Sequence, residues 1–403
     1  MRSAASRVAV LSRAAAVGIV SIGLTACLQG PPRDAVPEAD APELAQVNGY
    51  PLDIRMWGDS VAAFPKERLA QLRAQRIAAA KADPTIRVNE INALTLSGGG
   101  SSGAFGAGVL SGWTETGKRP QFDVVTGIST GALIAPFAFL GPAYDDELTE
   151  AFTTISDKDI FERVGIRGVI DTGAFTSNAP LRKMLDKYLT ENVIDQIAAE
   201  YRKGRRLLVG TTNLDADRPV IWNMGAIAAS GRPDRSDLFK QVVLASTSIP
   251  GAFPPQHFKV MADGKSFEEM HVDGGVTTEV FLMPAGLSLR KDPNGRMLKA
   301  RLYVIRNGRT TPEYSVVKAS LPAIAGKAIG SLIDTQAVGD LYRLYTISKR
   351  DGIDYNVIEI PPSFNVKAET PFDNFFMREL YKTGYEMGRK GIVWQKYPPG
   401  FVE

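Results

Sequence analysis

The chain has 403 residues, of which 44% are hydrophobic and 23% are charged, as in an ordinary globular protein with an ample core. The net charge of +3 is small, so the composition gives no case for a nucleic-acid partner. The single cysteine, Cys27, excludes disulfide bonds within the chain.

The first 26 residues have the pattern of a secretory signal peptide. Arg2, Arg7 and Arg13 precede the apolar run Ala14–Leu24. This run is too short to cross a bilayer. Leu24-Thr25-Ala26-Cys27 resembles a bacterial lipobox, in which the cysteine is lipidated and becomes the new N-terminus. The alternative is an ordinary signal peptide cut near Ala26. We expect the lipid anchor, because the only cysteine stands at the predicted cleavage point.

The position after the cysteine bears on the compartment. Leu28 follows the cysteine, at the position where an Asp would resemble an inner-membrane retention signal. The sequence therefore predicts a bacterial cell-envelope protein, anchored in the outer membrane and facing the periplasm.

Residues 27–45 are rich in Pro, Ala, Asp and Glu and contain few large apolar side chains, which predicts a disordered tether. Residues 46–92 are expected to form a helical extension, with one helix over Lys66–Lys81. The basic residues of this helix favour a solvated face over a small apolar stripe. Contact with an anionic membrane is the alternative.

A glycine-rich turn follows the short apolar strand predicted over Ala93–Ser97. Gly98-Gly99-Gly100-Ser101-Ser102-Gly103 fits a dinucleotide-binding fingerprint, which also requires an acid at the end of the next strand. Asp123 stands at the start of that strand instead. The turn therefore favours an oxyanion hole, because amides without side chains can approach a tetrahedral intermediate closely.

The next strand, predicted over Phe122–Thr126, runs into Gly127-Ile128-Ser129-Thr130-Gly131. This is the G-x-S-x-G pattern of a nucleophile elbow, in which Ser129 occupies a sharp strand-to-helix turn. Gly127 and Gly131 keep the surroundings of the serine uncrowded. The following helix directs its N-terminal amides, including that of Thr130, towards Ser129.

Residues 93–310 are expected to form the catalytic core, and residues 311–403 the mostly helical C-terminal part of the same domain. Ile329, Leu332, Ile333, Leu341 and Leu344 recur at helical spacing, which predicts a buried helix face. Further helices are predicted over 132–140, 144–154, 180–189, 193–201, 238–245 and 372–388, and further strands over 206–211, 218–222, 269–272 and 301–306.

A serine nucleophile requires a base, and the chain has only two histidines, His257 and His271. His271 and Asp273 are two residues apart on a predicted strand and therefore share a face. Either one can be the base, and a triad of Ser129 with Asp215 and His271 is a third arrangement. The glycines of Asp273-Gly274-Gly275 leave the carboxylate uncrowded, which favours Asp273.

Four motifs in order resemble the patatin-like phospholipases, which are lipid acyl hydrolases. They are Ser97–Gly108, Gly127–Gly131, the run Ser-Ile-Pro-Gly-Ala-Phe-Pro-Pro at 248–255, and Asp273–Gly275. The resemblance extends over about residues 93–281. The chain departs from the family at Ser97, where Asp is frequent, and at Ser102, where a basic residue is frequent.

The resemblance implies an α/β fold, namely a three-layer α/β/α sandwich with a mainly parallel central sheet. It also implies a dyad of Ser129 and Asp273 and an oxyanion hole at Gly98, Gly99 and Gly100. No His, Asp and Glu cluster has metal-ligand spacing, and we expect neither a metal nor a cofactor.

The sequence thus predicts a membrane-tethered serine acyl hydrolase that acts on phospholipids or other acyl-ester lipids. Two alternatives remain open: an esterase for small soluble esters that uses a Ser-His-Asp triad, and a catalytically silent envelope protein with a binding or scaffold role.

Overall fold

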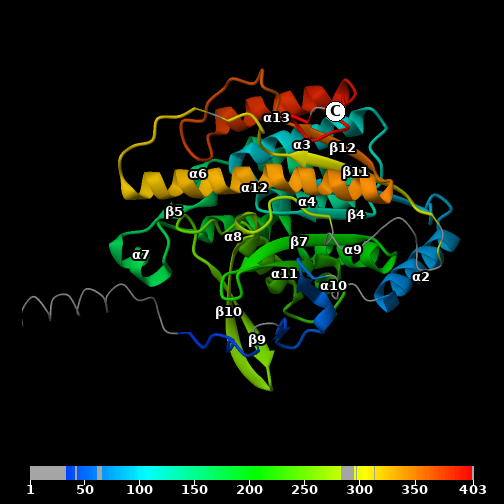
Figure 1. The fold of residues 1–403 in the computed structure, drawn as a ribbon, viewed down its shortest axis with the longest axis horizontal. Coiled ribbons are helices and arrows are strands. Elements are labelled where there is room, and N and C mark those ends of the chain that lie inside the picture. The colour runs from blue at the N-terminus through cyan, green and yellow to red at the C-terminus, as the bar shows by residue number, and fades with distance from the viewer. Residues whose placement is uncertain are drawn as a thin grey trace, which may run out of the picture.

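A computed structural model of the chain describes residues 33–40, 43–60, 66–282, 295, 297–312 and 314–401. The predicted signal peptide, Cys27 and the first part of the predicted tether therefore lie outside the described residues. The described residues form one large sheet with helices on both of its faces (Figure 1).

Five parallel strands make up the centre of the sheet. Their order is β12 (Asp354–Glu359), β11 (Lys299–Arg306), β3 (Glu90–Leu96), β4 (Val124–Gly127) and β7 (Arg206–Asn213). Parallel strands that helices cover on both faces are usually apolar throughout; Leu94, Leu96, Val125 and Val209 are fully buried. The predicted α/β fold with a mainly parallel central sheet is confirmed.

Beyond β7 the sheet continues with antiparallel strands, an arrangement that the sequence does not indicate. β10 (Lys265–Asp273) pairs with β7 and with β9 (Gln256–Ala262), and β9 pairs with β1 (Gln46–Val47). β8 (Arg218–Asn223) pairs with β7 and with β2 (Arg55–Trp57). A separate small sheet joins β5 (Glu162–Arg163) and β6 (Thr176–Ser177).

Most of the helices cover one face of the sheet. They form a single apolar core with Leu94, Leu96 and Ile305 of the parallel strands. The helices in this layer are α3 (Gly103–Glu115), α4 (Thr130–Leu140), α5 (Asp145–Thr153), α8 (Ala179–Tyr188), α9 (Glu191–Arg202), α10 (Met224–Ala228), α11 (Arg235–Ser246) and α13 (Asn374–Arg389). Shorter or peripheral helices are α2 (Lys66–Ala82), α6 (Asp157–Ile160) and α7 (Ile166–Thr172).

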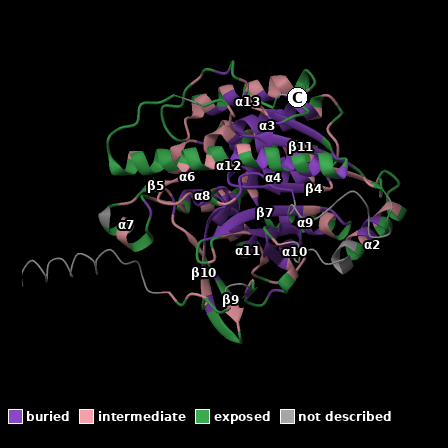
Figure 2. Cartoon of the chain, viewed as in Figure 1, coloured by how far each residue is buried: buried purple, intermediate pink, exposed green. Residues whose placement is uncertain are grey.

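The long helix α12 (Leu321–Asp351) covers the opposite face of the sheet. Leu341 and Leu344 are buried against Leu302 and Val304 of β11, as predicted. The prediction of a buried face is wrong for Leu332, whose exposed fraction is 71%. The N-terminal half of the helix extends past its packing partners and is coloured as exposed in Figure 2.

Helices α3 and α13 cross at very short range because glycines face the contact. A Cβ on Gly108 would lie 2.1 Å from the carbonyl oxygen of Tyr381, and one on Gly384 would lie 2.3 Å from that of Phe105. The backbones therefore touch directly, and α13 holds α3 in place behind the glycine-rich turn.

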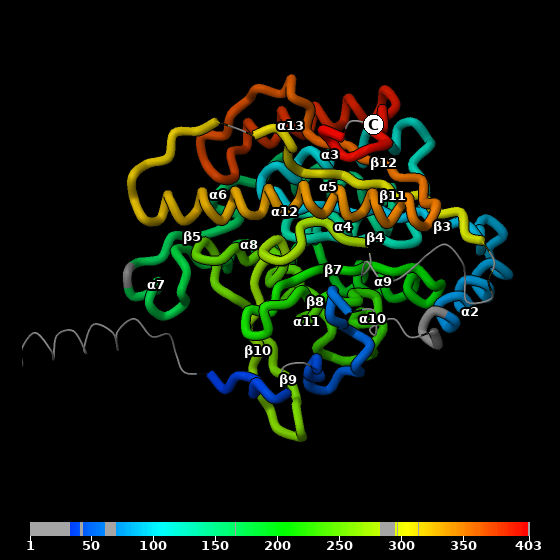
Figure 3. Tube along the Cα trace, in the orientation of Figure 1, coloured from blue at the N-terminus to red at the C-terminus, as the bar shows by residue number. Residues whose placement is uncertain are grey.

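The residues before the parallel centre pack on the sheet. Ala35 bridges to Glu268, Arg33 pairs with Asp215, and Ala45 is buried. Figure 3 shows these first described residues beside β9. Thus the described part of the segment expected to be a tether contacts the domain, and the expected helical extension over 46–92 contributes β1 and β2 as well as α2.

Candidate active site

Ser129 has the backbone conformation expected of a nucleophile elbow. Its φ of 53° and ψ of −125° are rare for a residue with a side chain, so the turn is strained. β4 ends at Gly127 and α4 begins at Thr130. A Cβ on Gly131 would lie 2.3 Å from the carbonyl oxygen of Leu96, so this neighbour of the serine can only be glycine. The turn presents Ser129 at the N-terminus of a buried helix.

The glycine-rich turn lies directly beside Ser129. A Cβ on Gly98 would be 2.9 Å from the Cβ of Ser129. Gly99 has a φ of 145° and Gly100 a φ of 56°, which a side chain would oppose. Among the described residues, the amides of Gly98, Gly99 and Gly100 donate no backbone hydrogen bond outside the regular helices and strands. These amides and that of Thr130, which has no acceptor within α4, are available to an oxyanion.

Asn307 fastens the glycine-rich turn, a role that the sequence does not indicate. Its side-chain amide donates to the carbonyl oxygen of Ser97 at 2.9 Å, and its Oδ1 accepts from the Gly106 amide at 3.0 Å. Its backbone amide donates to Ser97 Oγ at 2.8 Å. Asn307 is buried at the end of β11 and ties both ends of the turn to the sheet.

Asp273 reaches the site because two strands meet end to end along β7. β4 pairs with β7 as far as Val209, and β10, which runs in the opposite direction, pairs with β7 from Thr211 onwards. Only Gly210 separates the two paired stretches. The C-terminal end of β4, which leads to Ser129, therefore faces the C-terminal end of β10, which is Asp273.

A second serine spans the junction between these two strands. The Ser129 amide donates to Ser246 Oγ at 3.0 Å, and Ser246 Oγ donates to the carbonyl oxygen of Gly210 at 2.7 Å. Ser246 is fully buried in α11 and fixes the elbow to β7. Its role depends on tertiary contacts, so no sequence pattern reveals it.

The Asp273 carboxylate is fully enclosed and only partly hydrogen-bonded. Its Oδ1 accepts from the Gly275 amide at 2.8 Å. Burial raises the pKa of Asp273 to about 7, whereas the Gly275 amide and the Ser129 side chain act to lower it. The other carboxylate oxygen, Oδ2, has no hydrogen-bond partner among the described residues. A carboxylate of this kind is a much stronger base than one in water.

His271 is engaged elsewhere. Its Nδ1 lies 2.9 Å from Thr211 Oγ1, and its Nε2 lies 3.0 Å from Glu269 Oε2. Both ring nitrogens are therefore occupied in a fully buried cluster, and burial lowers the pKa of the imidazole. His257 is half-exposed on β9, and Asp215 pairs with Arg33. The arrangement does not assemble a triad of Ser129, Asp215 and His271.

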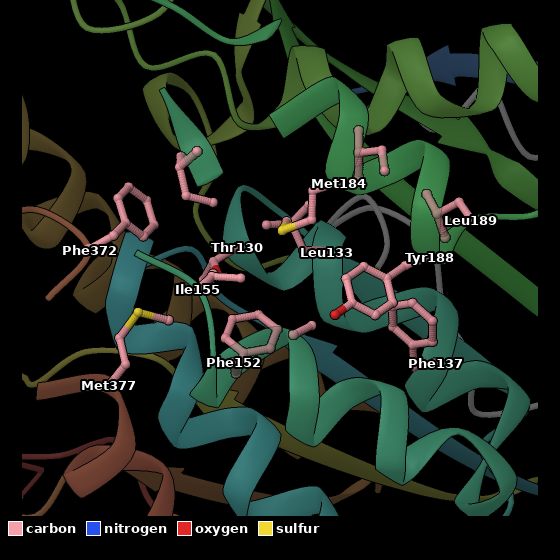
Figure 4. A pocket seen from close by; sticks show the side chains of 13 residues that line it. Thr130, Leu133, Phe137, Phe152, Ile155, Met184, Tyr188, Leu189, Phe372 and Met377 are labelled. Carbon is pink, nitrogen blue, oxygen red and sulfur yellow. The ribbon is translucent and has the colours of Figure 1, made fainter. Parts of the chain in front are cut away.

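An apolar pocket is lined by residues that include Thr130, the neighbour of Ser129 in the chain (Figure 4). Its walls come from α4, α5, α8 and the start of α13, so they are drawn from widely separated parts of the sequence. The lining residues are Thr130, Leu133, Phe137, Ala151, Phe152, Ile155, Ile160, Met184, Leu185, Tyr188, Leu189, Phe372 and Met377. The pocket offers an almost wholly apolar surface beside Ser129.

The described ranges contain neither a candidate metal centre nor a helix that could cross a membrane. Within them, no three or more His, Cys, Asp or Glu side chains gather in a way that could hold a metal ion. Across the same ranges, none of the helices is both long enough and apolar enough to cross a membrane. Asp123, considered above for a dinucleotide, pairs with Arg76 at the far end of β4.

In comparison with known proteins, residues 94–285 match the model of one family, which is described as patatin-like phospholipase. No curated protein sequence matches the chain.

Three solved structures are similar to the chain at low identity. VipD from Legionella pneumophila is 14% identical with a TM-score of 0.37, covering 75% of this chain and 66% of VipD. Human GIVD cytosolic phospholipase A2 is 9% identical with a TM-score of 0.32, covering 77% and 55%. The matching chain in the complex of ExoU with SpcU, from the type III secretion system of Pseudomonas aeruginosa, is 14% identical with a TM-score of 0.28. The match covers 75% of this chain and 52% of that chain. The chain thus spans between about half and two thirds of the length of these proteins.

Proposed function

We propose that the chain, whose residues 94–285 match the patatin-like phospholipase family, hydrolyses acyl esters of lipids with Ser129 and Asp273. The observation that carries the proposal is the end-to-end meeting of β4 and β10. It puts a serine in a strained elbow opposite a buried carboxylate, while both nitrogens of His271 are occupied.

In the proposed mechanism, Ser129 Oγ attacks the ester carbonyl while its proton passes to Asp273. The carbonyl oxygen becomes an oxyanion, which accepts hydrogen bonds from the amides of Gly99, Gly100 and Thr130. The tetrahedral intermediate collapses, and the leaving alcohol takes the proton from Asp273. Water then attacks the acyl-enzyme while Asp273 accepts its proton; the acyl–Oγ bond breaks, Asp273 returns the proton to Ser129 Oγ, and the fatty acid is released.

The apolar pocket supports a long acyl chain as the part of the substrate that is recognised. Thr130, one residue from the nucleophile, lines the pocket, and most of the other lining side chains are aliphatic or aromatic. An acyl chain in this pocket would bring its ester carbonyl towards the glycine-rich turn. Together with the family match, this supports a phospholipid or another acyl-ester lipid as the substrate.

We further propose that the mature protein is anchored to the outer membrane through a lipidated Cys27, on the strength of the lipobox-like Leu24–Cys27. The anchor would bring the domain to its lipid substrate. Replacing Cys27 with Ser should release the protein from the membrane fraction. Mass spectrometry of the N-terminal peptide should find a diacylglyceryl thioether on Cys27 of the wild type and none in the Ser variant. A wild-type Cys27 without lipid would contradict the anchor.

The catalytic proposal is tested by fatty-acid release from phospholipid vesicles. We expect Ser129→Ala to abolish release. A variant with His257→Ala and His271→Gln should retain turnover if it is folded, as judged by its thermal unfolding. Loss of turnover in the folded histidine variant would make a histidine the base. Hydrolysis of short soluble esters alone would overturn the lipid substrate, and absence of both activities and of fluorophosphonate labelling at Ser129 would favour a binding role.

A further inference from the structure

A second buried carboxyl group, that of Glu279, lies inside the proposed active site. The chain returns to the site after the turn Gly274–Val276 (η5), and the backbone amide of Glu279 donates to Asp340 Oδ2 of α12 at 2.7 Å. This bond and that of the next amide to the same oxygen fix the direction in which the side chain leaves the backbone. The Glu279 side chain is almost completely buried, with 4% of the residue exposed.

The Glu279 carboxyl fills the space between the two halves of the catalytic machinery. Its Oε1 lies 2.4 Å from the point that a Cβ on Gly98 would occupy, and the Cβ of Ser129 lies 2.9 Å from the same point. Its Oε2 lies 2.5 Å from the point that a Cβ on Gly275 would occupy, and Asp273 Oδ1 lies 3.2 Å from it. Glu279 is therefore a neighbour of the oxyanion turn, the nucleophile and the base.

The two neighbouring carboxyls have unmet hydrogen-bonding capacity. Within the described residues, Oε2 of Glu279 and Oδ2 of Asp273 have no hydrogen-bond partner. No ion pair in the same ranges joins Glu279 to a cation; Arg306, which faces it from β11, lies 3.7 Å from Asp334 and 4.0 Å from Glu359. If both of these neighbouring buried carboxyls were ionised, their repulsion and the loss of hydration would cost much free energy. One proton bound to the pair removes this cost.

We propose that Glu279 is a positioning residue of this site, which stays protonated and shares a single proton with Asp273, so that the pair carries one negative charge. The inference rests on the proposed function, because it assigns Glu279 a part in the same reaction. The neutral Glu279 donates a hydrogen bond to Asp273. That bond holds the Asp273 carboxylate in place and keeps it ionised, ready to accept the proton of Ser129.

The charges that surround Glu279 are consistent with this state. Burial raises the pKa of Glu279 well above its usual range, and the negative charges of Asp273, Asp340 and Asp334 raise it further. Arg306 is the cation that acts in the opposite direction. The carboxyls belong to the end of β10 and to α12 and the guanidinium belongs to β11, so acidic neighbours predominate around the group.

A shared proton predicts a bell-shaped dependence of the turnover rate on pH. When the pair holds two protons, Asp273 is neutral and cannot accept the proton of Ser129. When the pair holds none, the Glu279 carboxylate lies beside Gly98 and repels the oxyanion that forms there. Activity is therefore greatest when the pair holds one proton.

The test compares the pH profiles of kcat for Glu279→Gln and Glu279→Ala with that of the wild type, in full-length protein on phospholipid vesicles. Gln is neutral at every pH and still donates a hydrogen bond. Glu279→Gln should therefore lose the alkaline decline while keeping kcat near neutral pH within about tenfold of the wild type. Glu279→Ala should reduce kcat by about 10- to 100-fold, since it removes a hydrogen bond to a charged group. Glu200→Gln is the matched control and should leave the profile unchanged, because Glu200 is a half-buried acid of α9 that pairs with Arg205 just before the N-terminal end of β7.

A second measurement does not depend on turnover. The infrared C=O band of a protonated carboxyl should be present in the wild type at pH 8 and lost in Glu279→Gln. An alkaline decline that persists in Glu279→Gln, or an infrared spectrum that this substitution does not alter, would overturn the inference even if lipids are hydrolysed. If the wild type hydrolyses no ester, the proposed function fails, and the infrared difference still decides whether Glu279 is protonated.

Discussion

Replacing Asp273 with Asn should make the protein more stable above neutral pH while abolishing its activity. Asp273 is fully buried, and its pKa is raised from 3.8 to about 7 in the folded protein. In the unfolded chain the carboxyl ionises near its ordinary pKa. Between about pH 4 and pH 7, the folded state therefore binds more protons than the unfolded state, and the free energy of unfolding falls as the pH rises through this window.

The size of the effect follows from the difference between the two pKa values. Each pH unit corresponds to about 1.4 kcal/mol, so an interval of about three units makes the ionised Asp273 destabilising by about 4 kcal/mol above pH 7. Asn keeps the acceptor for the Gly275 amide and carries no charge, so the substitution removes the penalty without removing that hydrogen bond. Below pH 4 both states of the wild type hold the proton, and the difference should vanish.

The assay is urea unfolding of the wild type and Asp273→Asn at several pH values from 4 to 9. Asp237→Asn is the control, because Asp237 is an exposed aspartate that pairs with Arg182; its effect on stability should be small at every pH. If Asp273→Asn is less stable than the wild type at pH 8, or if its advantage is the same at pH 4 and pH 8, burial of an ionisable Asp273 is not the cause.

Three further substitutions address the glycine-rich turn, the helix crossing and the apolar pocket. Asn307→Ala removes the side-chain bonds that fasten the turn, so kcat on lipid esters should fall by about 10- to 100-fold with little change in KM; an unchanged kcat would show that the turn is held by other contacts. Gly384→Ala forces α13 away from α3 and should lower the free energy of unfolding by about 1–3 kcal/mol, whereas Gly326→Ala, in open space on α12, should not lower it. Urea unfolding measures both. Met184→Trp fills the apolar pocket, so hydrolysis of long-chain esters should fall while that of short-chain esters persists; a parallel loss of both would place the acyl chain elsewhere.

Several local features follow from the sequence because their causes are local. Short apolar runs closed by glycine predicted β3 and β4, and the structure places them at Glu90–Leu96 and Val124–Gly127. The G-x-S-x-G spacing predicted a strained serine, and Ser129 has a positive φ. Apolar periodicity located α12 as a helix, but it assigned Leu332 to the core because periodicity does not tell how far the supporting sheet extends.

The packing of the N-terminal residues is a second feature that composition and periodicity did not predict. Composition predicted a tether over 27–45, since the segment is polar and rich in proline and alanine. Its described residues are nevertheless held by contacts with distant partners, namely the pairing of Arg33 with Asp215 and the bridge of Ala35 to Glu268. The composition of a segment indicates how much apolar surface it can bury. It does not identify a partner that lies more than 180 residues away in the chain.

The sequence by itself determined the two strand–turn–helix units, the serine at the elbow and the glycines beside it, because the backbone conformation of each turn depends on residues within a few positions. It favoured Asp273 over His271 as the base, but it did not show where either residue lies relative to Ser129, since both belong to one face of the same strand. Only the tertiary structure decided those positions. The register of β10 on β7 brings Asp273 opposite the end of β4 and places His271 between Thr211 and Glu269. That register depends on pairing between segments about 60 residues apart, and a slip of one residue would exchange the faces of the whole strand.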